Sequence, residues 1–192
     1  RKGDTVLVHS QLLKVGLPEE DVFDLGKYYL DIILDIIGEK GELVLPAFTY
    51  SYCNKKEFSP LEDMSSVSEL ANSCIRNHIG YRTQDPLFSY VLVNPRSEEQ
   101  SFSNVCFDFD NGMAGYLTSR KAKYLMIGEE VYLTLIHACE QQLQTYNRFM
   151  KKFSGIIRLN GIKNQSDVYY YCRRYCDNTE IVLEKLTGIV FE

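Results

Sequence analysis

The chain lacks several features that would assign it to common classes of protein. It has no tryptophan and only three histidines, at positions 9, 78 and 137. Histidines scattered in this way, without a nearby group of carboxylates, do not make a convincing metal site. No apolar run approaches the roughly 20 residues that a membrane-spanning helix needs. We therefore expect neither a bound metal nor a membrane partner.

Motifs for several kinds of chemistry are also absent. Neither G-x-G-x-x-G nor G-x-x-x-x-G-K-[ST] follows the first predicted strand, which disfavours dinucleotide cofactors and P-loop chemistry. There is no G-x-S-x-G motif, and Ser10 has no glycines beside it that would form a nucleophile elbow. The net charge of -5 argues against a nucleic-acid partner, because such proteins usually carry a basic patch.

The six cysteines form no C-x-x-C pair. Cys172 and Cys176 could share a helix face, but no second pair completes a zinc site. We interpret all six as reduced thiols, which predicts a cytoplasmic protein. With 192 residues, 45% hydrophobic and 24% charged, the chain can form one domain with a substantial core.

The pattern of apolar residues predicts alternating strands and helices. Two apolar strands flank an amphipathic helix, which is a βαβ unit and implies a parallel sheet. Ligands of such sheets bind beyond the carboxyl ends of the strands. The predicted strands are 5–10, 42–46, 88–93 and an apolar run at 124–128; the predicted helices are 19–37, 67–77, 113–119, one around His137, and 179–186. Ser65 or Ser66 is expected to cap the second helix, and residues 153–159 and 169–178 have no assigned element.

The segment TLIHACE, residues 134–140, contains the most informative pair of side chains. His137 and Glu140 are three residues apart, so a helix places them on one face. A carboxylate on one imidazole nitrogen would fix the tautomer of a general base. The alternative is an ordinary polar pair on a helix surface. Cys139 would point away from the imidazole, and we expect it to be a buried, inert thiol.

The other two histidines are weaker candidates. His9 at the end of the first strand could be a base or a ligand, although a structural role is favoured. His78 lies near a helix end, where a surface role is expected.

Several segments in order resemble the aminoglycoside 3-N-acetyltransferase family. They are GDTVLVHS (3–10), GELVLPAFT (41–49), YRTQDPLFS (81–89), YLMIG (124–128), TLIHACE (134–140) and residues 148–155. The resemblance implies an α/β fold with a central mixed, partly parallel sheet flanked by helices. It also implies a single domain over residues 1–192, lacking the extreme N- and C-terminal parts of the full protein.

The resemblance implies acetyl-CoA as co-substrate and an amine on an aminoglycoside or related amino sugar as acceptor, with a homodimer as one option. His137 corresponds to the general base and Glu140 to its orienting carboxylate. The residues expected to line the CoA channel are His9, Ser10, Phe48, Thr49, Tyr50, Ser65 and Arg82. Those expected at the acceptor are Asp85, Tyr52 and Thr134.

The sequence departs from the family pattern at three places. Gln11 replaces a second serine after His9, residues 64–68 lack the usual proline and glycine, and Asp85 replaces a histidine. Asp85 could attract an amine or only cap a turn. These departures leave other hypotheses open. One is a nucleotide-linked amino-sugar acetyltransferase of surface-polysaccharide synthesis, with phosphates held by Arg148, Lys151 or Lys152. The others are a non-catalytic CoA-binding homologue and a hydrolase that uses Cys139.

Overall fold

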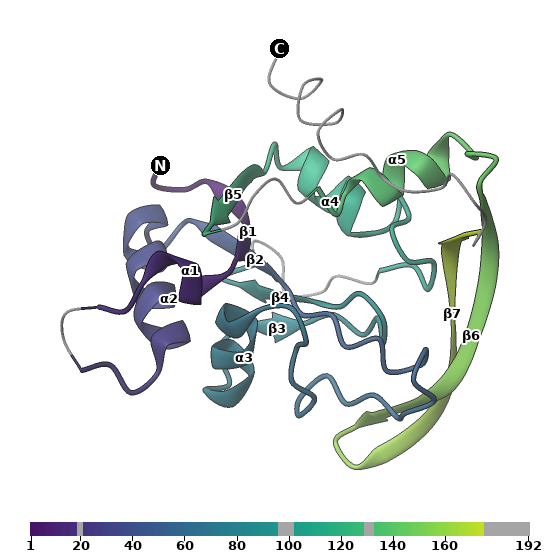
Figure 1. The fold of residues 1–192 in the computed structure, drawn as a ribbon, viewed down its shortest axis with the longest axis horizontal. Coiled ribbons are helices and arrows are strands. Elements are labelled where there is room, and N and C mark those ends of the chain that lie inside the picture. Colours follow the sequence, from purple (N-terminus) through teal and green to yellow (C-terminus); the bar gives the residue numbers. More distant parts are fainter. Residues whose placement is uncertain (19–20, 96–101, 129–132, 175–192) are drawn as a thin grey trace.

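A computed structural model describes residues 1–18, 21–95, 102–128 and 133–174, and its described part contains a five-stranded mixed sheet and a separate β-hairpin (Figure 1). The strand order is β3-β4-β2-β1-β5. Strand β1 (Thr5–Ser10) lies parallel to β2 (Glu42–Pro46) and to β5 (Lys123–Ile127). Strands β4 (Tyr90–Val93) and β3 (Tyr81–Arg82) extend the sheet in antiparallel pairing. The predicted mixed, partly parallel sheet is confirmed.

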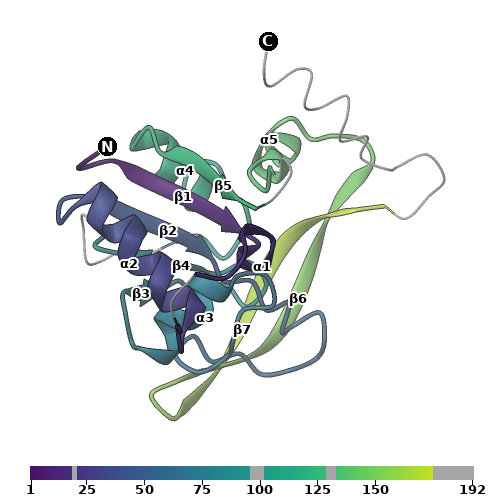
Figure 2. The same ribbon diagram turned by 60° about the vertical axis from the view of Figure 1, so that its left-hand side comes forward.

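One face of the sheet packs against helices α2 (Leu25–Ile37) and α3 (Glu69–Arg76), next to the short α1 (Leu12–Val15) (Figure 2). Strand residues with alternating side chains, such as Val6 and Val8, meet Leu30 and Ile33 of α2 there. Helix α2 ends where the sequence predicts, because Gly38 has a φ of 71° and its N–H donates to Leu34.

The other face packs against α4 (Met113–Ser119) and Ala138 of α5 (Ile136–Gln142). It also meets the hairpin formed by β6 (Arg148–Leu159) and β7 (Ile162–Arg173), which stands beside the sheet in Figure 1. Isolated bridges from Phe58 to Ile157 and from Val105 to Tyr169 fasten the hairpin to loops of the main body. This second face carries the predicted base.

Several element boundaries differ from the prediction. Helix α2 begins at Leu25 rather than near residue 19, because the Asp24 carboxylate caps it by accepting from the Lys27 N–H at 2.8 Å. Helix α3 begins at Glu69, and its N-cap is Ser68, not Ser65 or Ser66. Strand β4 begins at Tyr90, two residues later than predicted.

The hairpin was not predicted as such, and it corrects the interpretation of one cysteine. Cys172 lies on strand β7, so it cannot share a helix face with Cys176. Cys176 and the predicted helix at 179–186 lie outside the described residues. Within the described ranges, no helix has the length and apolar character that crossing a bilayer requires.

Candidate active site

Helix α5 presents His137 and Glu140 on one face, as their spacing predicts. The His137 Nδ1 and Glu140 Oε2 atoms are 2.9 Å apart, and both side chains are about four-fifths buried. An ionised carboxylate can only accept a hydrogen bond, so this contact requires the proton on Nδ1. The neutral ring then keeps a lone pair on Nε2, which is the atom that can accept a proton.

Arg148, the first residue of β6, lies behind this pair. Its Nη2 atom is 2.6 Å from Glu140 Oε2 and 3.1 Å from His137 Nδ1. Its Nη1 donates to the Tyr171 carbonyl at 3.0 Å, and the side chain is 3% exposed. Because Nδ1 cannot both donate to Glu140 and accept from Arg148, the shorter arginine–carboxylate contact identifies the ion pair, and the guanidinium N–H points to Glu140.

Burial lowers the pKa of His137, and the two charged neighbours act in opposite directions. The Glu140 carboxylate favours the protonated ring, whereas the Arg148 guanidinium disfavours it. The balance keeps the imidazole neutral near neutral pH, so it can act as a proton acceptor.

Cys139 does not join this cluster. Its side chain is exposed, so the prediction of a buried thiol is wrong. The reason is the helical rotation of about 100° per residue, which turns position 139 to solvent while position 138 enters the core. His78 is exposed, as expected.

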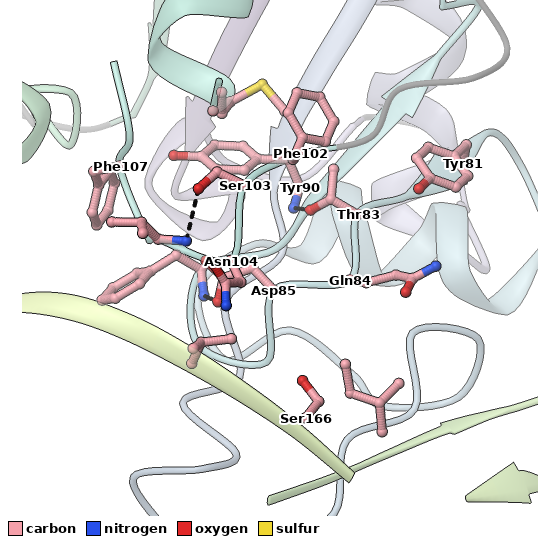
Figure 3. A pocket seen from close by; sticks show the side chains of 16 residues that line it. Tyr81, Thr83, Gln84, Asp85, Tyr90, Phe102, Ser103, Asn104, Phe107 and Ser166 are labelled. Carbon is pink, nitrogen blue, oxygen red and sulfur yellow. Dashed lines mark hydrogen bonds between the residues drawn. The ribbon is translucent and has the colours of Figure 1, made fainter. Parts of the chain in front are cut away.

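Aromatic rings surround the imidazole. The Phe107 ring centroid lies 5.2 Å from that of His137, and Tyr170 lies at 6.4 Å. Phe107 also lines a cavity of about 580 Å³ between the β3–β4 side of the sheet, the loop before α4, and the hairpin (Figure 3). His137 itself is not among the residues that line this cavity, but Phe107 both lines the cavity and packs against the His137 ring.

His9 and Thr134 come together near the site. The His9 Nε2 and Thr134 Oγ1 atoms are 3.4 Å apart, and the His9 ring stacks on Tyr124 at 5.2 Å. Burial lowers the pKa of His9 to about 4. Ser10 points to the other face of the sheet and lines a more open cavity of about 820 Å³ at the start of α1.

The residues after β2 that are predicted to line the CoA channel pack between the sheet and the neighbouring loops. Phe48 is buried and packs edge-on against Tyr50 and Phe88. Thr49 Oγ1 donates to the Pro86 carbonyl at 3.0 Å. Ser65 Oγ accepts from the N–H groups of Val67 and Ser68, which shapes the turn before α3.

Arg82 is buried, and its guanidinium binds protein groups rather than facing an open channel. It donates to the carbonyls of Pro60, Asp63 and Ala47, the last at 2.6 Å. It also contacts Ser89 Oγ at 3.2 Å. Burial lowers the pKa of Arg82 to about 10. The side chain therefore joins the loop around residues 60–63 to the end of β2.

Asp85 has one of the two roles that the sequence left open, the capping of a turn. Its Oδ1 atom accepts from the N–H groups of Leu87 and Phe88 at 2.8 and 3.0 Å, so it caps the turn. The same side chain lines the 580 Å³ cavity, and burial raises the pKa of its carboxyl. Tyr52 is buried against Gly155 of β6.

Two functional neighbours of the base were not predicted as such. The sequence suggests Arg148 only as a phosphate ligand, and it gives no signal for Phe107. The signal for Arg148 is weak, because a basic residue at the start of an unassigned strand has no local pattern that shows its burial.

In the described ranges, no group of three or more His, Cys, Asp or Glu side chains is placed to hold a metal ion.

A family model described as aminoglycoside 3-N-acetyltransferase matches residues 7–186. The chain belongs to this family. The resemblance of the ordered segments is thereby confirmed, and so is the prediction that the chain is an acetyltransferase. Among curated proteins, none matches the chain.

Solved structures of aminoglycoside acetyltransferases share the fold at low sequence identity. AAC(3)-IIb gives a TM-score of 0.76 at 14% identity, over 99% of this chain and 79% of that chain. AAC-IIIb, in a binary complex with CoASH, gives 0.76 at 15% identity, over 98% and 77%. Sisomicin-bound AAC-VIa gives 0.71 at 15% identity, over 90% and 71%.

Proposed function

We propose that the chain transfers an acetyl group from acetyl-CoA to an amine of an aminoglycoside or related amino sugar, with His137 as general base. The observation that carries this proposal is the 2.9 Å contact between His137 Nδ1 and Glu140. It leaves Nε2 unprotonated, and a buried neutral imidazole can accept a proton during attack.

The reaction needs no covalent enzyme intermediate. The amine nitrogen attacks the thioester carbonyl, the new C–N bond forms, and the C–S bond breaks. His137 Nε2 takes the proton that the amine loses and can return it to the departing CoA thiolate. Glu140 stabilises the transient imidazolium, and Arg148 holds Glu140 in place.

The family and the CoASH complex of AAC-IIIb support acetyl-CoA as the co-substrate. We propose that the strand ends at His9, Phe48, Thr49 and Tyr50, together with Ser65, line its channel. Ser10 faces the other side of the sheet and is not assigned to the channel. For Arg82, the bonds to three carbonyls support a role in holding the channel wall rather than direct contact with CoA.

The sisomicin complex of AAC-VIa supports an amino-sugar acceptor. A nucleotide-linked amino sugar has less support, because Arg148 is paired with Glu140 and Lys152 Nζ lies 2.8 Å from Asp167. The hydrolase hypothesis has less support as well, because Cys139 is exposed on another face of α5.

The test combines turnover with binding. The wild type, His137→Ala and the control His78→Ala are assayed for CoA release from acetyl-CoA with a panel of amines. We expect a loss of about 10²–10⁴-fold for His137→Ala and no change for the exposed control. Unchanged turnover by His137→Ala refutes the proposed base. Calorimetric binding of acetyl-CoA by a wild type that acetylates nothing supports the non-catalytic alternative.

A further inference from the structure

The cavity of about 580 Å³ has a distinctive set of walls. Its volume lies within the range of small-molecule sites. Tyr81 and Gln84, both exposed, stand at one end in Figure 3, and Phe107 stands at the other. Because Phe107 packs against the His137 ring, the inner end of the cavity lies next to the proposed base.

The charge of these walls restricts the ligand. Among the described lining residues, Asp85 is the single charged side chain, and there is no Lys, Arg or His. One carboxylate can pair with one ammonium group, and a bound ammonium would in turn favour its ionised form. Additional ammonium groups would be desolvated without partners. Phosphates would lack the cations that usually bind them.

The uncharged lining residues suit a ligand that carries hydroxyl groups and also has apolar faces. Phe88, Phe102 and Phe107 offer ring surfaces, and Ser103 and Ser166 offer hydroxyls. The Tyr90 side chain is 3% exposed, and its hydroxyl has no hydrogen-bond partner within the described part of the chain. A buried hydroxyl of this kind is usually satisfied, and a ligand hydroxyl or amine would satisfy it.

We propose that this cavity is the acceptor site and that it takes a small amine with a single positive charge on an otherwise uncharged, hydroxylated body. An amino sugar with one free amine belongs to this class, whereas polycationic aminoglycosides and phosphate-bearing nucleotide sugars do not. The inference rests on the proposed acetyl transfer at His137, since it places the acceptor nitrogen at the Phe107 end.

The first arm of the test compares acceptors. Glucosamine, sisomicin and a uridine-diphosphate sugar with a free amine are assayed for kcat/KM through CoA release. We expect glucosamine to exceed the other two by about tenfold or more, because each unpaired charge in the cavity weakens binding. A higher kcat/KM for sisomicin or the nucleotide sugar overturns the proposal.

The second arm changes the cavity. Asp85→Asn keeps the oxygen that caps the turn but removes the charge, and we expect the KM for glucosamine to rise about tenfold or more while that for acetyl-CoA is unchanged. Ser166→Trp fills the cavity, and Gln165→Trp is the matched control on the exposed, opposite face of β7. Because the chain has no tryptophan, the emission of each variant reports whether the new ring is buried.

The outcomes separate this proposal from the proposed function. If turnover depends on His137 but is insensitive to a buried ring at position 166, the cavity is not the acceptor site and the acetyltransferase mechanism stands. If no amine is acetylated, calorimetry with glucosamine alone decides. Binding that Ser166→Trp abolishes and Gln165→Trp preserves supports the cavity, and its absence overturns the inference.

Discussion

Replacing Glu140 by glutamine tests how the base is held. The substitution keeps the shape of the side chain but removes the charge that stabilises the His137 imidazolium and pairs with Arg148 at 2.6 Å. The glutamine amide can also present an N–H to Nδ1, which favours the tautomer with the proton on Nε2. That tautomer cannot accept a proton from the amine, so we expect kcat/KM to fall by about 10²–10⁴-fold.

The same change leaves a buried cation without its partner. Breaking a fully buried ion pair costs about 3–5 kcal/mol. Arg148 is 3% exposed, but Glu140 is 19% exposed and Arg148 keeps its bond to the Tyr171 carbonyl, so about 2–3 kcal/mol is expected here. Denaturant unfolding measures this cost. The control Glu62→Gln breaks an exposed pair with Arg158 and should leave stability unchanged.

The pH dependence distinguishes a lost charge from a damaged fold. With Glu140 neutral, burial and Arg148 both disfavour the protonated ring, so the pKa of His137 should fall further. The acid limb of the kcat/KM profile then moves to lower pH while the plateau drops. A folded Glu140→Gln variant with a plateau within about threefold of the wild type, or with an unmoved acid limb, would refute the role given to this carboxylate.

Three further predictions concern other parts of the molecule. Burial lowers the pKa of His9 from 6.5 to about 4, so as the pH falls the unfolded chain takes up this proton before the folded chain does. The free energy of unfolding should therefore fall by about 3 kcal/mol between pH 6.5 and 4. Denaturant titrations of His9→Phe should lack this pH-dependent contribution. Gly155→Ala would place a Cβ 2.5 Å from the Tyr52 ring and should cost about 1–3 kcal/mol in thermal unfolding, unlike the exposed Asn164→Ala; equal stability of the two refutes the packing argument. Cys139→Ser should retain near-normal kcat, and an inactive, folded variant would restore the hydrolase hypothesis.

Local signals explain what the sequence could predict. The runs at β1 and β2 are buried on both faces, and continuous apolar sequence indicates such strands directly. Helix α4 was predicted with its observed bounds. The pairing of His137 with Glu140 follows from helix geometry alone, because three residues nearly complete a turn.

The hairpin and Arg148 depend on contacts between distant parts of the chain. In β6, exposed residues such as Met150 and Lys151 interrupt the apolar pattern, so it lacks the alternation that indicates a strand. Strand β6 is instead held in place by its pairing with 12 residues of β7 and by its bridge to Phe58, and neither contact can be read from the local sequence. Arg148 becomes a partner of Glu140 only when this hairpin is placed beside α5.

The proposed base and the proposed acceptor cavity are built from different elements. His137, Glu140 and Arg148 fix a proton-accepting nitrogen, and any amine placed there meets the same chemistry. If the cavity is the acceptor site, as we propose, its walls decide which amine binds. On the proposed assignment, Asp85, the single carboxylate among the described lining residues, stands where the family pattern has a histidine and would select for one positive charge. Acceptor choice should therefore change with Asp85 while the dependence on His137 remains.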